Sequence, residues 1–169
     1  MDDSASGTQL PQELIDSILD NVYKQQDLRA CALVARSFRL PSQRKLFEHL
    51  SLHPEALHGE PASIAHFERL HAIFIESPHL AKFVKSLDLR VLRAENLPLM
   101  ETEVVLDILG ALCNVVGLDI HAPTVKAPRL AAALVPMIGS AGLKTLSLRN
   151  DTDIQLLKAR EGDLQTLRT

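Results

Sequence analysis

The sequence predicts an α/β protein in which a short helical segment precedes strands and helices that alternate along the chain. Three apolar patterns with helical spacing lie within residues 10–52. After them, the pattern apolar-x-x-apolar-x-apolar recurs, and stretches with helical spacing separate its copies. Parallel strands need long connections of this kind, so the second part of the chain is expected to form a parallel sheet.

The first predicted helix begins after Pro11, because a proline is tolerated at the start of a helix. Gln12 and Glu13 then place an amide and a carboxylate where the helix dipole favours them. The apolar residues that follow recur at helical spacing and form one broad stripe, which consists of Leu14, Ile15, Ile18, Leu19 and Val22.

A second helix is predicted with Asp27 as its N-cap. Arg29 and Arg36 are assigned to its exposed side. The side predicted to be buried consists of Leu28, Ala32, Leu33 and Val34.

A third helix is expected to start at Pro41 and Ser42 and to lead into a short strand at 50–52. Three helices within about 45 residues approach the size below which a domain rarely supports itself without a partner, a metal or disulfides. The apolar surplus therefore predicts binding to another protein. The alternative is a helical subdomain that packs on the rest of its own chain.

The segment resembles a known family. LPQEL, the aliphatic run after it, RACALVARSF and the closing LFEHLSL stand in the order found in an F-box. F-box proteins are substrate receptors of SCF-type cullin ubiquitin ligases, so the resemblance implies an F-box at 9–52 that docks on a SKP-family adaptor and, through it, a cullin. SPHLAKFVKSLDL, after a further helix, is similar to fungal-type F-box proteins.

The resemblance also implies which side chains face the adaptor. Where many relatives have a tryptophan in the tail of the second helix and a cysteine shortly before it, this chain has Phe38 and Ala35, so the apolar anchor is smaller. Carried over position by position, the implied adaptor-binding residues are Leu10, Pro11, Leu14, Ile15, Ile18, Leu28, Val34 and Phe38.

The repeated pattern organises residues 53–169, and its copies are Val84-Leu87-Leu89, Val115-Leu118-Ile120 and Leu143-Leu146-Leu148. An earlier copy, Phe47-Leu50-Leu52, closes the helical segment, and a fifth begins at Leu164 and Leu167. Helices are predicted between the copies at about 66–76, 101–112, 128–138 and 153–159. This succession is typical of a leucine-rich-repeat solenoid with a curved parallel sheet.

The repeat is degenerate. The asparagine or cysteine expected in the turn after each strand is replaced by Leu92, Pro123 and Asp151, so a non-repetitive α/β domain is the alternative. Because a solenoid needs a polar cap and the sequence ends within its fifth strand pattern, the chain is expected to be incomplete at residue 169. Residues 1–8 are expected to be disordered.

Composition favours a cytoplasmic or nuclear interaction protein. The net charge is −3 and aromatic residues make up only 4%, which argues against a nucleic-acid groove built on phosphate contacts and base stacking. Cys31 and Cys113 lie in apolar helical patterns and are expected to be buried, reduced thiols. The start MDDSASG is not a signal peptide, and Val104 to Ile120 contains too many polar residues for a membrane span.

No catalytic constellation emerges. His66 and His71 are not at the i,i+4 spacing of a helical metal site, and Gly139 to Gly142 lacks the leading glycine of a nucleophile elbow. Neither a phosphate-binding glycine loop nor the Cys-His clusters of a zinc-dependent ligase occur in the sequence. We therefore expect a binding protein without enzymatic activity, cofactor or metal.

The expected function is that of a substrate receptor whose repeat region presents a target protein to the ligase. Polar residues at alternate strand positions could contact the target, although such residues are more often simply solvated. These possible target-binding residues are Asp88, Arg90, Asp119, His121, Ser147 and Arg149. The alternatives are an F-box scaffold that works outside a ligase and a small α/β enzyme.

Overall fold

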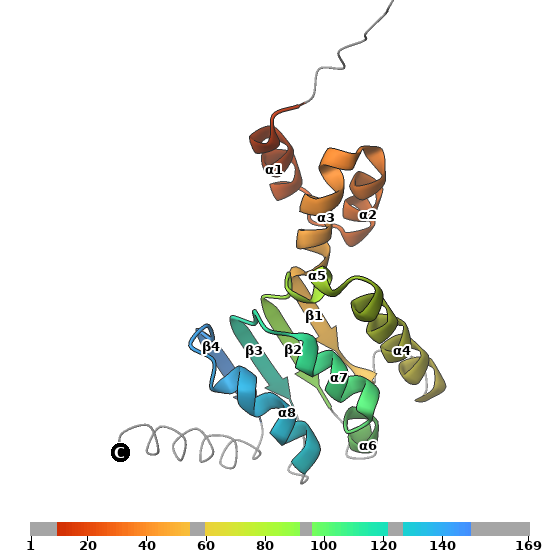
Figure 1. Cartoon of the computed structure of the whole chain (residues 1–169), viewed down its shortest axis with the longest axis vertical. Helices are drawn as coiled ribbons and strands as arrows, with labels where there is room; N and C mark the ends of the chain where they lie inside the picture. Colours follow the sequence, from red (N-terminus) through yellow and green to blue (C-terminus); the bar gives the residue numbers. More distant parts are fainter. Residues whose placement is uncertain (1–9, 55–59, 92–95, 122–126, 150–169) are drawn as a thin grey trace, which may run out of the picture. The chain divides into compact units, whose positions relative to one another are not determined.

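A computed structural model describes residues 10–54, 60–91, 96–121 and 127–149. The chain divides between Leu46 and Phe47 into two compact units, here called the helical unit and the sheet unit (Figure 1). The described residues form eight helices and four strands, so the mixed α/β class is confirmed.

The helical unit contains α1 (Gln12–Asp20), α2 (Gln25–Val34) and most of α3 (Arg36–Glu48). Helix α1 begins directly after Pro11, as predicted, and the Pro11 carbonyl accepts hydrogen bonds from the backbone N–H groups of Leu14 and Ile15. The small core of the helical unit consists of the buried side chains Ile15, Leu19 and Leu28. Partly buried side chains pack against them, namely Val22, Cys31, Phe38 and Leu46.

The predicted boundaries of α2 were wrong. The helix begins at Gln25 with Lys24 as its N-cap, so Asp27 lies in the first turn. It ends at Val34 because Ala35 is extended, with φ −154° and ψ 159°. Leu33 and Val34, predicted to be buried, are instead 85% and 73% exposed.

The predicted start of α3 at Pro41 and Ser42 was also wrong. The helix begins at Arg36, and Pro41 lies inside it. A proline in a helix interior removes one backbone hydrogen bond, so a proline in the sequence is ordinarily read as the boundary of a helix. Here Phe38 and Leu46 both pack on the core of the helical unit, so tertiary contacts hold the helix through the proline.

The four strands are β1 (His49–Leu52), β2 (Ser86–Arg90), β3 (Gly117–His121) and β4 (Thr145–Arg149). They pair in parallel in the order β1-β2-β3-β4. Leu50, Leu87, Leu118 and Leu146 stand opposite one another in successive strands, which confirms the predicted pairing and register.

The helices of the sheet unit are α4 (Glu60–Glu76), α5 (Pro78–Ala81), α6 (Leu97–Met100), α7 (Glu103–Ala111) and α8 (Pro128–Ile138). The helix predicted at 128–138 is confirmed at both ends, α7 is shorter than predicted, and α4 starts earlier. The helix at 153–159, the strand pattern at Leu164 and Leu167, the turn positions 92, 123 and 151, and residues 1–8 lie outside the described residues.

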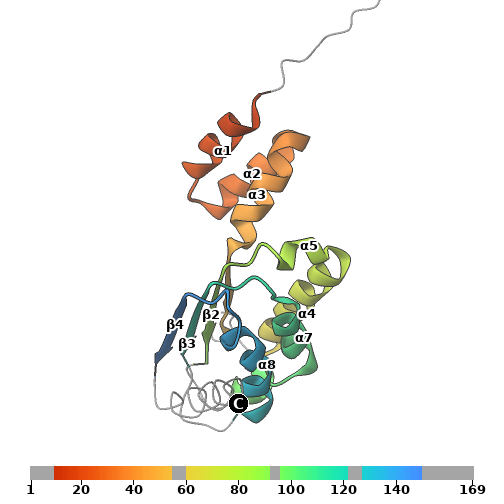
Figure 2. The same ribbon diagram turned by 60° about the vertical axis from the view of Figure 1, so that its left-hand side comes forward.

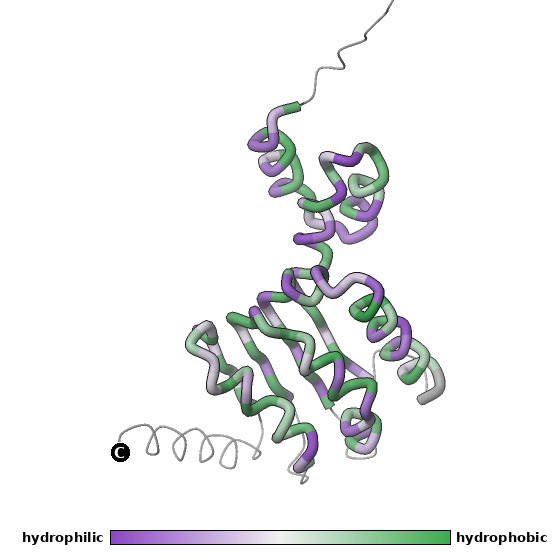
Figure 3. The backbone as a smooth tube through the Cα atoms, in the orientation of Figure 1, coloured by the Kyte–Doolittle hydropathy of each residue, from purple (hydrophilic) through white to green (hydrophobic). Residues whose placement is uncertain are grey.

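Helices α4, α7 and α8 lie on one side of the sheet (Figure 2). Burial alternates along β2 and β3, and Figure 3 shows apolar and polar residues alternating along these strands. The apolar side faces the helices and forms one continuous core that includes Leu87, Leu89 and Ile108. The polar side of each strand therefore points away from the helix layer.

The prediction of two buried thiols was wrong. Both cysteines are free, but Cys31 is only partly buried and Cys113 is exposed. Cys113 follows α7 in the connection to β3, beyond the apolar helix pattern on which the prediction rested. None of the helices within the described ranges combines the length and apolar composition needed to cross a bilayer.

Candidate functional site

The sheet presents one face that carries no helix among the described residues, and this polar face is the first candidate site (Figure 2). Two rows of side chains run across it from strand to strand. The first row consists of Ser51, Asp88, Asp119 and Ser147, which stand opposite one another in the sheet register. The second row consists of Arg90, His121 and Arg149, together with His53, which follows β1 directly.

Asp88 is held by two basic neighbours. Arg90 Nε donates a hydrogen bond to Asp88 Oδ1 at 3.0 Å, and Arg90 Nη2 lies 2.8 Å from Oδ2. His53 Nε2 lies 3.2 Å from the same Oδ2 atom. The hydrogen bond and the charge of Asp88, with a smaller contribution from Asp119, raise the pKa of Arg90 above its ordinary value, so this guanidinium stays charged.

Asp119 has looser partners. His121 Nε2 lies 3.8 Å from its Oδ1, and Arg149 Nη2 lies 3.9 Å from its Oδ2. These distances exceed those of hydrogen bonds, so only electrostatic attraction joins the groups. Each aspartate of the face is therefore flanked by one arginine and one histidine. The contacts of Asp88 are short, and those of Asp119 are long.

Three polar atoms of this face, namely His53 Nε2, Asp119 Oδ1 and His121 Nε2, are buried and make no hydrogen bond of good geometry, although His53 Nε2 lies 3.2 Å from Asp88 Oδ2 and His121 Nε2 lies 3.8 Å from Asp119 Oδ1. Elsewhere in the described ranges only Ser42 Oγ shares this property. Buried polar atoms are nearly always hydrogen-bonded in folded proteins, so an unsatisfied cluster needs an explanation. The ion pairs of His53 with Asp88 and of His121 with Asp119 supply the electrostatic partners of these atoms within the face itself.

The structure thus brings together all six residues suggested for target binding. Asp88, Asp119 and Ser147 share one row, and Arg90, His121 and Arg149 share the next. Their position on the outward face of the sheet is confirmed, while their role in binding stays a prediction. Sequence reasoning missed His53, which lies one residue past the end of β1 but has the same strand alternation as Ser51.

The second candidate site is on α1. Leu10, Leu14 and Ile18, here called the apolar row, follow one another at four-residue intervals and are 48%, 51% and 46% exposed. Four-residue spacing places Leu14 and Ile18 on one side of α1, and Leu10 precedes the helix by two residues.

The structure separates the implied adaptor-binding residues into two groups. Pro11 and Val34 are exposed like the apolar row, whereas Ile15 and Leu28 are buried in the core of the helical unit and Phe38 packs on that core. Two exposed side chains were missed. Tyr23 and Leu33 are both 85% exposed, and no feature of the local pattern distinguishes them from core residues.

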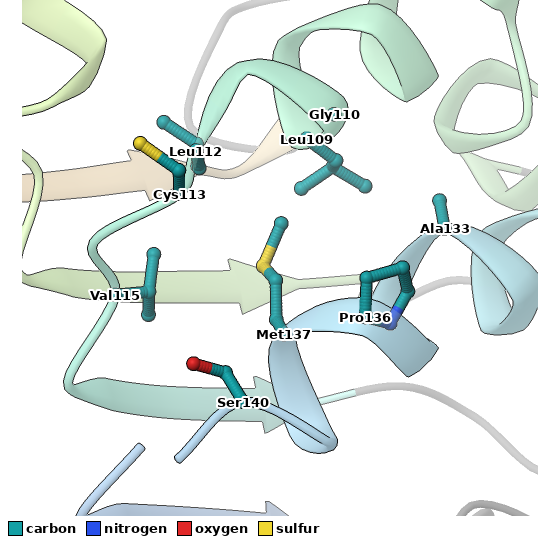
Figure 4. A pocket seen from close by; sticks show the side chains of 9 residues that line it. All are labelled: Leu109, Gly110, Leu112, Cys113, Val115, Ala133, Pro136, Met137 and Ser140. Carbon is teal, nitrogen blue, oxygen red and sulfur yellow. The ribbon is translucent and has the colours of Figure 1, made fainter. Parts of the chain in front are cut away.

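The described residues hold no candidate metal site beside these surfaces. In the part of the chain that the structure describes, no three histidine, cysteine or acidic side chains gather as metal ligands would. A hollow between α7 and α8 is lined mainly by apolar side chains such as Leu109, Val115 and Met137 (Figure 4). Cys113 is the one ionisable group among its nine lining residues.

No family model, curated protein or solved structure matches this chain. Its function is therefore inferred from the two surfaces, the apolar row and the polar face.

Proposed function

We propose that this chain is a substrate receptor of an SCF-type cullin ubiquitin ligase. In this proposal, the helical unit is an F-box that docks on a SKP-family adaptor, and the sheet unit is a leucine-rich-repeat-like region that holds a target protein. The chain performs no chemistry itself and acts in the cytoplasm or nucleus. The sequence resemblance at residues 10–52 supports the family, and the apolar row supports the docking.

The apolar row is the observation that carries the proposal. Helix α1 has two adjacent apolar stripes, whereas a surface helix of a globular protein normally has one. Ile15 and Leu19 form the stripe that is buried in the helical unit. Leu14 and Ile18, each one position earlier in the sequence, form the second stripe, and it is about half exposed. The second stripe is not part of the core of the helical unit, and its exposed apolar surface is available for binding a partner protein.

Known protein–protein interfaces indicate how much surface the docking should bury and which side chains should provide its affinity. A stable protein–protein interface buries about 1,200–2,000 Å² in total, and a few central apolar side chains provide most of its affinity. The apolar row would supply such a centre, and the exposed Leu33 and Val34 would add apolar area. A core of three buried side chains also gains from a partner, since binding stabilises the folded unit.

The sheet unit supports the second half of the proposal. Its strands succeed one another in register with a helical connection on one side, which is the arrangement expected of stacked repeats. The opposite face carries the aspartates, arginines and histidines of the polar face. A receptor that binds adaptor and target at once raises the effective concentration of the target near the ubiquitin-charged enzyme.

Adaptor capture by the full chain tests the proposal. The double variant Leu14→Ala with Ile18→Ala should lose capture of a purified SKP-family adaptor, because truncating a central apolar anchor costs roughly 2–4 kcal/mol. The matched control is Ile73→Ala with Ile75→Ala, which removes two exposed aliphatic side chains from α4. Circular dichroism shows whether each variant is folded.

Three outcomes contradict the docking: no capture by the unaltered chain, full capture by the α1 variant, or equal loss in the control. Phe38→Ala is a poor test, because Phe38 packs on the core of the helical unit. Adding a cullin to the captured complex separates a ligase receptor, which brings the cullin down, from an adaptor-bound scaffold, which does not.

A further inference from the structure

The helical unit exposes aliphatic side chains where α2 ends and α3 begins. Leu33 and Val34, the last two residues of α2, are 85% and 73% exposed. Leu40, in the second turn of α3, is 47% exposed. Single exposed aliphatic side chains are common on protein surfaces, but adjacent ones form a patch that suits an interface.

Three arginines stand beside these aliphatic side chains. Arg29 precedes Leu33 by four residues on α2, and Arg36 precedes Leu40 by four residues on α3, so each pair lies on one side of its helix. Arg39 is the neighbour of Leu40 in the sequence. The six residues are here called the basic corner, which consists of Arg29, Leu33, Val34, Arg36, Arg39 and Leu40.

The charge of the basic corner is not offset by acidic side chains. Its three arginines are exposed and make no ion pair in the part of the chain that the structure describes. Asp27 precedes Arg29 by two residues, which corresponds to about 200° around a helix, so it lies on the opposite side of α2. The other acidic side chains among the described residues of the helical unit all belong to α1, namely Glu13, Asp16 and Asp20.

Two of the arginines also stand where the helix dipole disfavours them. Arg36 is the first residue of α3 and Arg39 is the fourth, and the first turn contains no acidic residue. The N-terminus of a helix carries a partial positive charge, so cations in the first turn lower its stability. Neither arginine belongs to the core of the helical unit. Exposed, unpaired cations at positions unfavourable for folding point to a role in binding.

We propose that the basic corner binds an acidic amphipathic helix of a partner protein. The complement of aliphatic side chains flanked by cations is an aliphatic stripe flanked by carboxylates, which such a helix presents. Carboxylate geometry matches the guanidinium fork, and arginine is the cation enriched in protein interfaces, where lysine is depleted. The inference rests on the proposed function only in identifying this helix as part of the adaptor.

Fluorescence anisotropy on the full chain provides the test, with three fluorescein-labelled peptides as probes. The acidic probe consists of three repeats of Glu-Glu-Leu-Leu, which places its leucines on one side of a helix. The basic probe has lysine in place of each glutamate, and the polar probe has serine in place of each leucine. The acidic probe should bind best, because it alone offers both carboxylates and aliphatic side chains, and its binding should weaken as salt rises.

The double variant Arg36→Gln with Arg39→Gln separates binding from folding. It should bind the acidic probe about fivefold more weakly, since each exposed ion pair contributes modestly. Its thermal unfolding midpoint, followed by circular dichroism, should nevertheless rise by about 1–3 °C, because two cations leave the positive end of the helix dipole and glutamine has a helix propensity similar to that of arginine. A variant that is more stable and binds more weakly has not lost binding through unfolding.

The matched control is Arg69→Gln with Lys82→Gln, which removes the same charge from two exposed side chains of the sheet unit. It should bind the acidic probe within about twofold of the unaltered chain, since contacts at the basic corner and not the overall charge determine binding. Leu33→Ser tests the aliphatic part of the corner. It should bind the acidic probe about fivefold more weakly and bind the polar probe as the unaltered chain does.

Three results overturn the proposal: the basic probe binds as well as the acidic one, the Arg36 and Arg39 variant binds like the control, or that variant unfolds at a lower temperature than the unaltered chain. Vesicles containing phosphatidylserine that bind more tightly than the acidic probe would replace the partner helix by a membrane surface. Tighter binding of hexathymidylate would replace it by a nucleic acid.

The peptide test is independent of adaptor docking. The Leu14 and Ile18 variant should bind the acidic probe within about twofold of the unaltered chain, since these residues lie outside the basic corner. An unaltered chain that binds the acidic probe and captures no adaptor overturns the proposed function alone. A chain that captures the adaptor and prefers the basic probe overturns the inference alone.

Discussion

The helical unit and the sheet unit solve the problem of burying apolar residues in opposite ways. Among the described residues, three side chains form the buried core of the helical unit, and twenty-four form that of the sheet unit. The helical unit leaves Leu10, Leu14 and Ile18 about half exposed. The sheet unit buries the apolar side of β2 and β3 under helices and exposes a polar face.

The comparison shows that an exposed apolar surface in the helical unit and an exposed polar surface in the sheet unit support different inferences. In a unit with so few buried side chains, an exposed aliphatic stripe points to a partner that completes the fold. In a unit with a large core, stability does not depend on a partner, and the side chains of the polar face can be varied without unfolding. Stability and binding should therefore respond separately to mutation in each unit.

The largest effect is expected for Leu87→Ala in the sheet unit. Leu87 is fully buried between the sheet and its helices, so the variant should lose about 3–4 kcal/mol of unfolding free energy through lost burial and a residual cavity. Urea unfolding measures the loss. Leu146→Ala is the matched control, because Leu146 stands in the same register column but is only half-buried. Equal losses at both positions would show that the core does not centre on β2.

A smaller loss, about 2–3 kcal/mol, is expected for Ile15→Ala, because a core with exposed surroundings can relax around the deletion. That loss should unfold the helical unit and leave the sheet unit folded, which hydrogen exchange resolves peptide by peptide. The neighbouring Leu14→Ala should cost less than about 1 kcal/mol, since Leu14 is half exposed. Simultaneous unfolding of both units by Ile15→Ala would contradict their independence.

The third prediction is a gain in stability. Pro41→Ala should stabilise the helical unit by about 1–2 kcal/mol, because alanine restores the N–H that a helix interior uses and removes the ring clash. Part of the gain is offset by the greater freedom of the unfolded chain. Pro11→Ala, at the N-cap of α1, should give no gain in the same urea titration. A loss of stability in the Pro41 variant would mean that α3 starts at the proline.

Much of the sheet unit could be predicted because its information is local and repeated. Each apolar-x-x-apolar-x-apolar pattern specifies a strand with one buried side, and a one-residue slip in pairing would turn every leucine of that strand outward. Leu87, Leu118 and Leu146 therefore had one consistent register, and the structure has it. The same alternation placed Asp88 and Asp119 on the outward face.

The helical unit was harder to predict because its boundaries depend on contacts that are distant in sequence. Asp27 and Pro41 both carry strong local preferences for helix starts, yet both lie inside helices. Lys45 of α3 donates a hydrogen bond from Nζ to the Leu19 carbonyl and lies 3.2 Å from Asp20, so tertiary contacts tie α3 to the end of α1. Local preferences are worth a few tenths of a kcal/mol for most residues and about 3 kcal/mol for a proline inside a helix, and here the tertiary packing outweighs them.

The sequence by itself determined the α/β class, the parallel order of the strands and the division of each strand into an apolar and a polar side, because strand alternation has a period of two that any core must respect. Only the tertiary structure decided which apolar residues of α1 are buried. Ile15 and Leu14 are adjacent, equally aliphatic and part of one predicted stripe, but one is fully buried and the other is half exposed. The position of a neighbouring helix made that choice, and the hydropathy of the segment does not contain it.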